Sequence, residues 1–279
     1  MVLKLSFILT VLIQIGVPLG LGFWLARRAA NAGVFTRKAA WGIFGVGVLT
    51  FIGSQVVHIP LLAGLTALFK LPGMWQPSAA FAPWFNAITL GLLAGLCEEP
   101  ARWIGFKLLR AKARPHLAAL LAGAGHGGIE SIFIGLMVLV NFVTMLAVQA
   151  AINSGASLPA NLELLKAQAG LFWDTPWHHV LAGGVERLAA IILHISLSVL
   201  VWRGITAARG GGWWLVGAIL LHGLVDMLAV ASSQIWQWSV WSIEALVAAL
   251  ALGTAGLALW AWRTAPRPEP PLAAEPVEP

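Results

Sequence analysis

Seven long apolar runs dominate the chain, and short polar segments separate them. The runs cover residues 4–26, 40–69, 84–106, 117–150, 178–202, 213–232 and 239–262. About 20 apolar residues are enough for a helix to cross the hydrocarbon core, so each run is long enough to span a membrane. The pattern therefore predicts an all-α fold, a polytopic membrane helix bundle of about seven transmembrane helices.

Three of these runs and one loop carry further information. Lys4 precedes an apolar stretch that is too long for a signal-peptide core, and no clear small-residue cleavage site follows, so we expect a retained span. The runs at 40–69 and 117–150 exceed a single crossing, which predicts tilt, kinks or a turn outside the membrane. In the loop at 151–177 we expect a short amphipathic helix.

The loops on the two sides of the predicted membrane differ strongly in basic residues. One side carries Arg27, Arg28, Arg37, Lys38, Lys107, Arg110, Lys112, Arg114, Arg203, Arg209, Arg263 and Arg267. The other side carries only Lys4, Lys70 and Lys166. Cytoplasmic loops are enriched in Lys and Arg, so this bias predicts an outside N-terminus and a cytoplasmic C-terminus. We expect residues 1–263 to form a single transmembrane domain with its core at about 84–232. We expect the Pro- and Glu-rich residues 264–279 to form a disordered cytoplasmic tail.

Composition excludes several classes of protein. Of the 279 residues, 59% are hydrophobic and only 10% are charged, which a soluble fold could not accommodate without large exposed apolar patches. A nucleic-acid-binding protein, a cytosolic enzyme and a secreted disulfide scaffold are therefore poor fits, and Cys97 is the only cysteine. The net charge of +6 reflects the basic loops. The expected location is the plasma membrane of a bacterial cell, as a multi-pass protein in contact with lipid.

Twelve ionisable residues interrupt the apolar runs. They are His58, Glu98, Glu99, Arg102, His126, Glu130, Glu186, Arg187, His194, His222, Asp226 and Glu244. Each costs roughly 2.5–3.5 kcal/mol at the centre of a membrane helix, so each needs a reason. Ten of the twelve occur in four consecutive runs, from 84–106 to 213–232.

Their depth predicts one cluster. Glu98, His126, His194 and His222 each lie nine or ten residues from a residue that marks the cytoplasmic boundary. At 1.5 Å per residue this is about 13–15 Å, close to the bilayer midplane. The pairs Glu98 and Arg102, His126 and Glu130, and His222 and Asp226 are each spaced i,i+4, which places both members on one helix face.

Such a cluster is suited to activating water, by either of two routes. In the first, His194, His222 and a carboxylate hold Zn²⁺ or another divalent metal with one position open for water. In the second, which needs no metal, Glu98 or Glu99 takes a proton from water while His194 and His222 stabilise the oxyanion. Arg102 would orient the glutamate pair. Each motif also has a purely structural interpretation, as an ion pair, a glycine-rich helix contact or a hydrogen-bonded core histidine.

Four short motifs together resemble a known family. They are Glu98-Glu99-Pro-Ala-Arg102, Gly125-His126-Gly127-Gly128-Ile129-Glu130, Glu186-Arg187 with His194, and His222-Gly-Leu-Val-Asp226. The combination, within about 84–232, resembles the YhfC family of intramembrane metallopeptidases, related to the CAAX prenyl endopeptidase and bacteriocin-processing superfamily. The resemblance implies an all-helical fold in which Glu98 and Glu99 include the water-activating carboxylate. His194, His222 and Asp226 would complete the site.

The chain departs from the CAAX endopeptidase pattern at three positions. Two residues rather than three separate the glutamate pair from Arg102. Asp226 occupies a position where Asn is frequent. Ala190, four residues before His194, occupies a position where the pattern has an aromatic residue. These differences count against cleavage of prenylated proteins more than against hydrolysis itself.

Three functions are therefore open. The first is an intramembrane peptidase whose membrane-bound or hydrophobic peptide substrate reaches the cluster laterally; the peptide substrate is implied by the resemblance. The second is a proton- or ion-coupled transporter that uses the same polar cluster. The third is a catalytically silent membrane scaffold.

Overall fold

The chain folds into a bundle of long α-helices. The structure, a computed structural model, describes residues 1–113, 115–154 and 162–265. The helices are α1 (Val2–Asn31), α2 (Arg37–Phe69), α3 (Ala82–Leu109), α4 (His116–Asn153), α5 (Leu162–Trp173), α6 (Trp177–Thr206), α7 (Gly211–Gln234) and α8 (Val240–Arg263), and a short 3-10 helix, η1 (Arg110–Ala113), follows α3. Within these ranges there is no β-strand, so the predicted all-α class is confirmed.

Seven of the eight helices match the seven predicted spans. By length and composition, α1, α2, α4, α6, α7 and α8 could each cross a membrane. Helix α3 has a similar length of 28 residues but contains Glu98, Glu99 and Arg102, which lower its hydropathy. Helix α5 has only 12 residues and confirms the short helix expected between 151 and 177. The chain is an integral, multi-pass membrane protein.

Helix α6 lies at the centre of the bundle. Its most apolar stretch is 72% buried, whereas the corresponding stretches of the other five candidate spans are 17–33% buried. It contacts α1, α3, α4, α7 and α8. Side chains on α6 can therefore reach groups on several helices at once. The outer helices instead turn apolar side chains such as Leu49 and Leu220 toward lipid.

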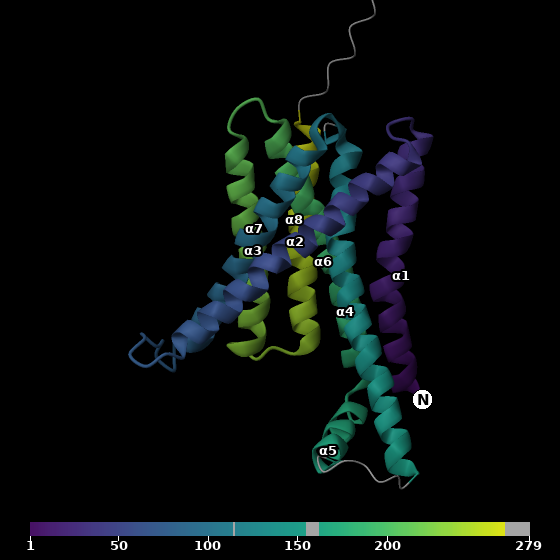
Figure 1. Ribbon diagram of the computed structural model, residues 1–279, viewed down its shortest axis with the longest axis vertical. Helices are drawn as coiled ribbons and strands as arrows, with labels where there is room; N and C mark the ends of the chain where they lie inside the picture. Colours follow the sequence, from purple (N-terminus) through teal and green to yellow (C-terminus); the bar gives the residue numbers. More distant parts are fainter. Residues whose placement is uncertain (114, 155–161, 266–279) are drawn as a thin grey trace, which may run out of the picture.

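The two longest helices depart from a simple upright packing, as the lengths of their runs predict. Figure 1 shows α2 crossing its neighbours obliquely, while α4 extends past the bundle toward α5. Helix α2 contacts both α3 and α4, so it lies across these two helices.

Glycines allow the helices of two pairs to approach until their main-chain atoms are in contact. A Cβ atom at Gly47 would overlap the carbonyl oxygen of Ala122, so α2 and α4 touch through their main chains. A Cβ atom at Gly95 would likewise overlap the carbonyl oxygen of Ile219, which brings α3 against α7. Small residues commonly allow this kind of packing between membrane helices.

The connections that carry most basic residues lie at one end of the bundle. The α1–α2, α3–α4 and α6–α7 connections and the end of α8 are together at the upper end of Figure 1. Arg114, Arg267 and the predicted disordered tail, apart from Thr264 and Ala265, lie outside the described residues. Which side of the membrane this end faces stays a prediction from the charge bias.

Candidate metal centre

Four helices bring the central polar residues into one buried cluster. Helix α3 contributes Glu98, Glu99 and Arg102, α4 contributes His126, α6 contributes His194 and α7 contributes His222. Each of these side chains is at most 5% exposed. The sequence predicts one cluster from their common depth, and the structure places them in contact.

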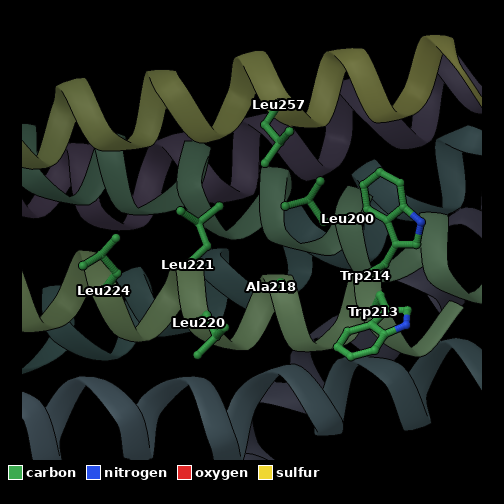
Figure 2. Close-up of a pocket in the computed structure, with 9 residues that line it drawn as sticks. Leu200, Trp213, Trp214, Ala218, Leu220, Leu221, Leu224 and Leu257 are labelled. Atoms are coloured by element: carbon green, nitrogen blue, oxygen red, sulfur yellow. The ribbon is translucent and has the colours of Figure 1, made fainter. Parts of the chain in front are cut away.

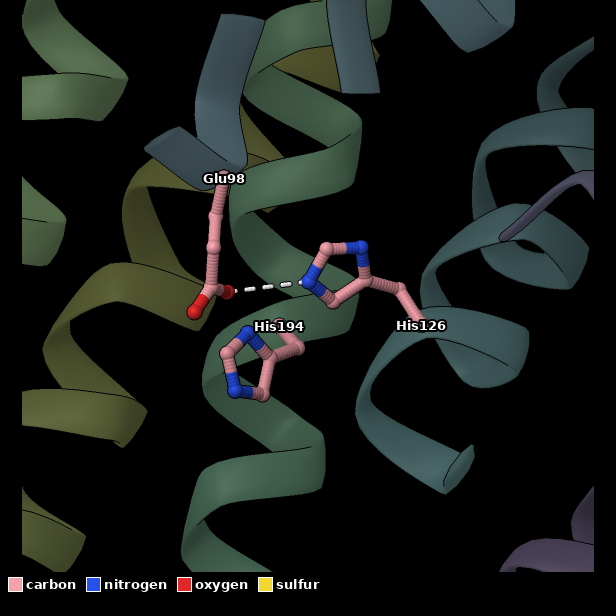
Figure 3. A group of neighbouring side chains, drawn as sticks. All are labelled: Glu98, His126 and His194. Carbon is pink, nitrogen blue, oxygen red and sulfur yellow. Dashed lines mark hydrogen bonds and ion pairs between the residues drawn. The ribbon is translucent and has the colours of Figure 1, made fainter. Parts of the chain in front are cut away.

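Glu98 lies at the centre of this cluster. Its Oε2 is 2.9 Å from Nε2 of His126, a contact drawn as the dashed line in Figure 3, and 3.5 Å from Nη2 of Arg102. The same oxygen is 4.0 Å from Nε2 of His222. The other carboxylate oxygen accepts a hydrogen bond of 3.2 Å from the side-chain amide of Gln55. Glu98 thus faces groups from α2, α4 and α7 at the same time.

Thr50 determines which nitrogen of His126 carries the proton. The Thr50 hydroxyl donates to the carbonyl oxygen of Gly47 at 2.7 Å and lies 2.9 Å from Nδ1 of His126. A hydroxyl has one proton to donate, so it accepts from Nδ1–H. Nε2 then carries a lone pair and faces Glu98 Oε2, which is also an acceptor. Two acceptors at this separation require a proton or a cation between them.

The residues around Glu98 fit a divalent metal. Glu98, His126 and His194 each offer one ligand atom, and these three atoms lie within 4.8 Å of one another. Two imidazoles and one carboxylate are a common ligand set for catalytic zinc. The surrounding charge agrees, because five carboxylates (Glu98, Glu99, Glu130, Glu186 and Asp226) accompany only two guanidinium groups (Arg102 and Arg187). A bound cation would offset part of this negative charge.

Glu99 lies behind the cluster and orients two of its members. Its Oε1 accepts from Nη1 of Arg102 at 2.5 Å and from Nδ1 of His222 at 2.7 Å. The Nε2 atom of His222 makes no hydrogen bond with the residues that the structure describes. It lies 3.6 Å from Oδ2 of Asp226, whose side chain is 39% exposed. The two adjacent glutamates thus have different surroundings, since Glu98 faces the histidines and Glu99 anchors Arg102 and His222.

His194 connects the cluster to a second group of charges. Its Nδ1 is 2.5 Å from Nη2 of Arg102, and its Nε2 is 2.5 Å from Oε2 of Glu130. Glu130 accepts a 2.8 Å hydrogen bond from Nη1 of Arg187, which also pairs with Glu186. Both nitrogens of His194 have a partner, so a metal at this site would replace one of these contacts.

The structure groups the histidines differently from the first metal hypothesis. That hypothesis pairs His194 with His222, whereas the three closely spaced ligand atoms belong to Glu98, His126 and His194. Outside the cluster, His58 is on α2, and its buried ring nitrogens have no hydrogen-bond partner in the part of the chain that the structure describes. Glu244 is on α8.

Two polar residues of the site, Thr50 and Gln55, are missing from the sequence-based prediction. Both are uncharged, so a search for ionisable groups passes over them. A usable signal exists, because Thr50, Ser54 and Gln55 are spaced i, i+4 and i+5 within an otherwise apolar run. That spacing places them on one side of a helix.

Comparisons with known proteins agree with the motifs. The model of the protein family described as "YhfC intramembrane metalloprotease" matches residues 14–251 of this chain. The chain is 32% identical over 221 residues to a protein of Bacillus subtilis (strain 168) named "Uncharacterized membrane protein YhfC". The aligned region covers 76% of this chain and 78% of the relative. No solved structure matches.

Proposed function

The chain belongs to the YhfC intramembrane metalloprotease family, and on this premise we propose that it hydrolyses a peptide bond in a membrane-associated protein or hydrophobic peptide. The observation that carries this proposal is the buried group of Glu98, His126 and His194 inside a membrane-spanning bundle. Ionisable groups are costly in that environment, and they are rarely kept there without a function.

The metal of this mechanism would be Zn²⁺ or another divalent ion, held by Glu98, His126 and His194. When bound, it would polarise water or the substrate carbonyl group. The protein supplies the orientation of the ligands. Thr50 holds His126 through Nδ1, so that Nε2 faces Glu98. Partners of this kind fix the tautomer and direction of metal-binding histidines.

In this proposal His222 carries protons during hydrolysis and Asp226 assists it. The Nδ1–H group of His222 is held by Glu99, which leaves Nε2 free to accept a proton from water and to return it to the leaving amine. Asp226 Oδ2, at 3.6 Å, lies on the more exposed side and can stabilise the imidazolium that forms. His222 is therefore the proton carrier in this proposal, with Asp226 as its charge partner.

Arg102 supplies a fixed positive charge beside the reacting groups. Its two terminal nitrogens contact Glu99 and His194, and Nη2 is also 3.5 Å from Glu98. A charge held in this way can stabilise an oxyanion without moving. The metal-free alternative uses the same arrangement, with Glu98 taking the proton from water while Arg102 faces the developing negative charge.

The substrate would reach this site through a groove between α2 and α3. The groove has a volume of about 480 Å³ and is lined by Val46, Leu49, Thr50, Gly53, Ser54, Val57, Leu96, Cys97, Pro100, Ala101, Ile104, Gly105 and Leu108. Its walls are mainly apolar, which suits a segment that comes from lipid. Thr50 both lines the groove and contacts His126, so the groove ends next to the candidate metal ligands.

Metal content measured by mass spectrometry on detergent-purified protein tests the proposal. We expect about one metal ion per chain in the wild type. His126→Ala and His194→Ala should lose it, because each removes a proposed ligand. His222→Ala should retain it but lose peptide hydrolysis. His179→Ala, at an exposed position on α6, is the matched control.

Two outcomes would contradict this assignment. Metal-free wild-type protein after purification without chelator would favour the mechanism in which Glu98 acts alone as the base. If His222→Ala loses the metal while His126→Ala keeps it, the histidine ligands are His194 and His222 instead.

A proton-coupled transporter is the second candidate, because the polar contacts continue beyond the cluster. They run from His194 through Glu130 and Arg187 to Glu186, whose side chain is 29% exposed. Proton flux across reconstituted vesicles, abolished by Glu130→Gln, would favour transport over hydrolysis.

A further inference from the structure

A second groove lies on a face of α7 that does not carry His222 or Asp226. It has a volume of about 400 Å³ and is formed by α6, α7 and α8. Its lining is Leu200, Trp213, Trp214, Gly217, Ala218, Leu220, Leu221, Leu224 and Leu257, most of which Figure 2 shows along α7. None of these side chains is charged, and the groove is not part of the candidate metal centre.

The length of this groove suits a lipid acyl chain in one leaflet. From Trp213 to Leu224 the helix rises about 16 Å, at 1.5 Å per residue. The hydrocarbon core of a bilayer is about 30 Å thick, so this is roughly half of it. Leu220 and Leu224 are exposed along the groove, so an acyl chain would cover apolar side chains over its whole length.

Tryptophan and arginine lie together at one end of the groove. Figure 2 shows Trp213 and Trp214 next to each other near the start of α7. Trp214 also contacts Arg203, whose guanidinium carbon is 5.4 Å from the centre of its ring. Tryptophan is enriched where hydrocarbon meets the headgroups, so this end is expected to lie at the headgroup level.

Arg203 has unused hydrogen-bond donors at this end. Among residues 1–113, 115–154 and 162–265, its buried Nε and Nη1 atoms have no hydrogen-bond partner, and Nη2 makes a long contact of 3.5 Å with the carbonyl oxygen of Thr264. A guanidinium group always carries its positive charge and has five N–H donors. Where few acceptors are nearby, some of these donors make no hydrogen bond. An anionic oxygen would supply a partner for these donors.

The other charged residues near this end of the groove are positive, like Arg203. Arg209, in the α6–α7 connection, and Arg263, at the end of α8, are exposed near this end. In the connections of this end that the structure describes, there is no Asp or Glu. The complementary ligand is therefore an anion attached to an apolar chain.

We propose that this groove binds an acidic phospholipid, with the phosphate beside Arg203 and Trp214 and one acyl chain along Leu220, Leu221 and Leu224. The site is independent of the proposed peptidase activity, because it uses none of the residues of the metal centre. Its role would be to hold α7 against α6 and α8 from the lipid side.

Native mass spectrometry of the full-length, delipidated protein tests this site. The probes are phosphatidylglycerol and phosphatidylcholine with identical acyl chains. We expect the wild type to prefer phosphatidylglycerol by about fivefold, the factor that corresponds to roughly 1 kcal/mol for one basic residue near an acidic lipid. Arg203→Gln should remove this preference.

A second variant tests the apolar part of the site. Gly217 lines the groove and has open space around the position of a Cβ atom, so the side chain in Gly217→Leu should extend into the groove and weaken the binding of both lipids. Gly253→Leu on α8 is its control, because it also has open space but does not line the groove. Arg28→Gln is the control for charge, because Arg28 stacks on Trp24, which is not part of the groove.

Three results would overturn the proposal. An equal loss of phosphatidylglycerol in Arg28→Gln and Arg203→Gln would show a general effect of surface charge. Equal binding of the two lipids by the wild type would remove the role of the phosphate. Unchanged binding in Gly217→Leu would show that the lipid does not occupy the groove, and this variant remains informative if Arg203→Gln fails to fold.

Discussion

Among the single residues of the cluster, the orientation of the imidazole rings is the main structural feature. Thr50 holds Nδ1 of His126, and Glu99 holds Nδ1 of His222. The Nε2 atoms of both rings are directed toward Glu98, at 2.9 and 4.0 Å. Because these rings are held before any ligand binds, little reorganisation is needed at the moment of reaction.

Thr50→Val tests whether this orientation matters for metal binding. The substitution keeps the shape of the side chain but removes the acceptor for Nδ1–H of His126. We expect metal affinity to fall by about 10- to 100-fold, the usual effect of losing such a partner. A zinc titration against a competing chelator measures the affinity. Thr66→Val on the same helix is the control, since its hydroxyl bonds only within α2, to Leu62; equal affinity in the two variants would refute the role of Thr50.

At the level of helices, main-chain contacts between neighbours set the positions of the site residues. Gly47 of α2 lies against Ala122 of α4, one turn before Thr50 and His126 meet. Gly95 of α3 lies against α7 one turn before Glu99, which bonds His222. The close approach of each helix pair thus determines whether short side chains can reach their partners.

Gly47→Ala should separate α2 from α4 and weaken the contact between Thr50 and His126. Because the added methyl group meets main-chain atoms that cannot rotate away, we expect a loss of about 1–3 kcal/mol in stability. Gly45→Ala meets nothing within 4 Å and should be neutral or stabilising by up to about 1 kcal/mol. Thermal unfolding of both variants in detergent gives the comparison, and a normal melting temperature for Gly47→Ala would mean that the helices are not in main-chain contact.

The groove between α2 and α3 can be tested through Cys97, the only cysteine in the chain. If the groove opens to lipid, an apolar maleimide should label Cys97 in vesicles faster than a charged, membrane-impermeant one. Gly53→Leu should slow this labelling, because Gly53 lines the groove and has open space for a side chain. Gly45→Leu, on the same helix but outside the groove, should leave the rate unchanged. If Gly53→Leu leaves the labelling rate of Cys97 unchanged, the groove is not the route to the site.

For the whole molecule, charge is separated into two regions. The buried ionisable groups gather at the meeting point of α3, α4, α6 and α7, while most of the loop arginines and lysines lie at one end of the bundle. This separation is expected for a protein that spans a membrane, since a charge exposed to hydrocarbon is costly and basic loops remain in the cytoplasm.

The charge bias predicts that the C-terminus is cytoplasmic and the N-terminus outside. A fusion of alkaline phosphatase, which is active only outside the cytoplasm, should be inactive after residue 265. The same enzyme inserted in the α7–α8 connection should be active, because one span separates the two positions. Phosphatase activity at the C-terminus would mean that the orientation is the reverse of the predicted one, or that the number of membrane crossings differs.

The sequence by itself determines that the protein is an all-helical membrane protein, and it predicts a common depth for the polar groups. Apolar runs of sufficient length specify membrane helices because the backbone must satisfy its hydrogen bonds internally in lipid. The fixed rise of 1.5 Å per residue then converts the position of Glu98, His126, His194 and His222 into a common depth. The motifs within these runs are also sufficient to indicate the family.

Only the tertiary structure decides which of these groups touch. Sequence gives depth along a helix, but contact also depends on the rotation of each helix about its axis and on which helices are neighbours. Glu98 and Glu99 are adjacent in sequence but point about 100° apart, so Glu98 reaches His126, whereas Glu99 hydrogen-bonds Arg102 and His222. The inclusion of His126 in the metal group and the role of Thr50 follow from the same cause, since both depend on how closely α2 and α4 approach.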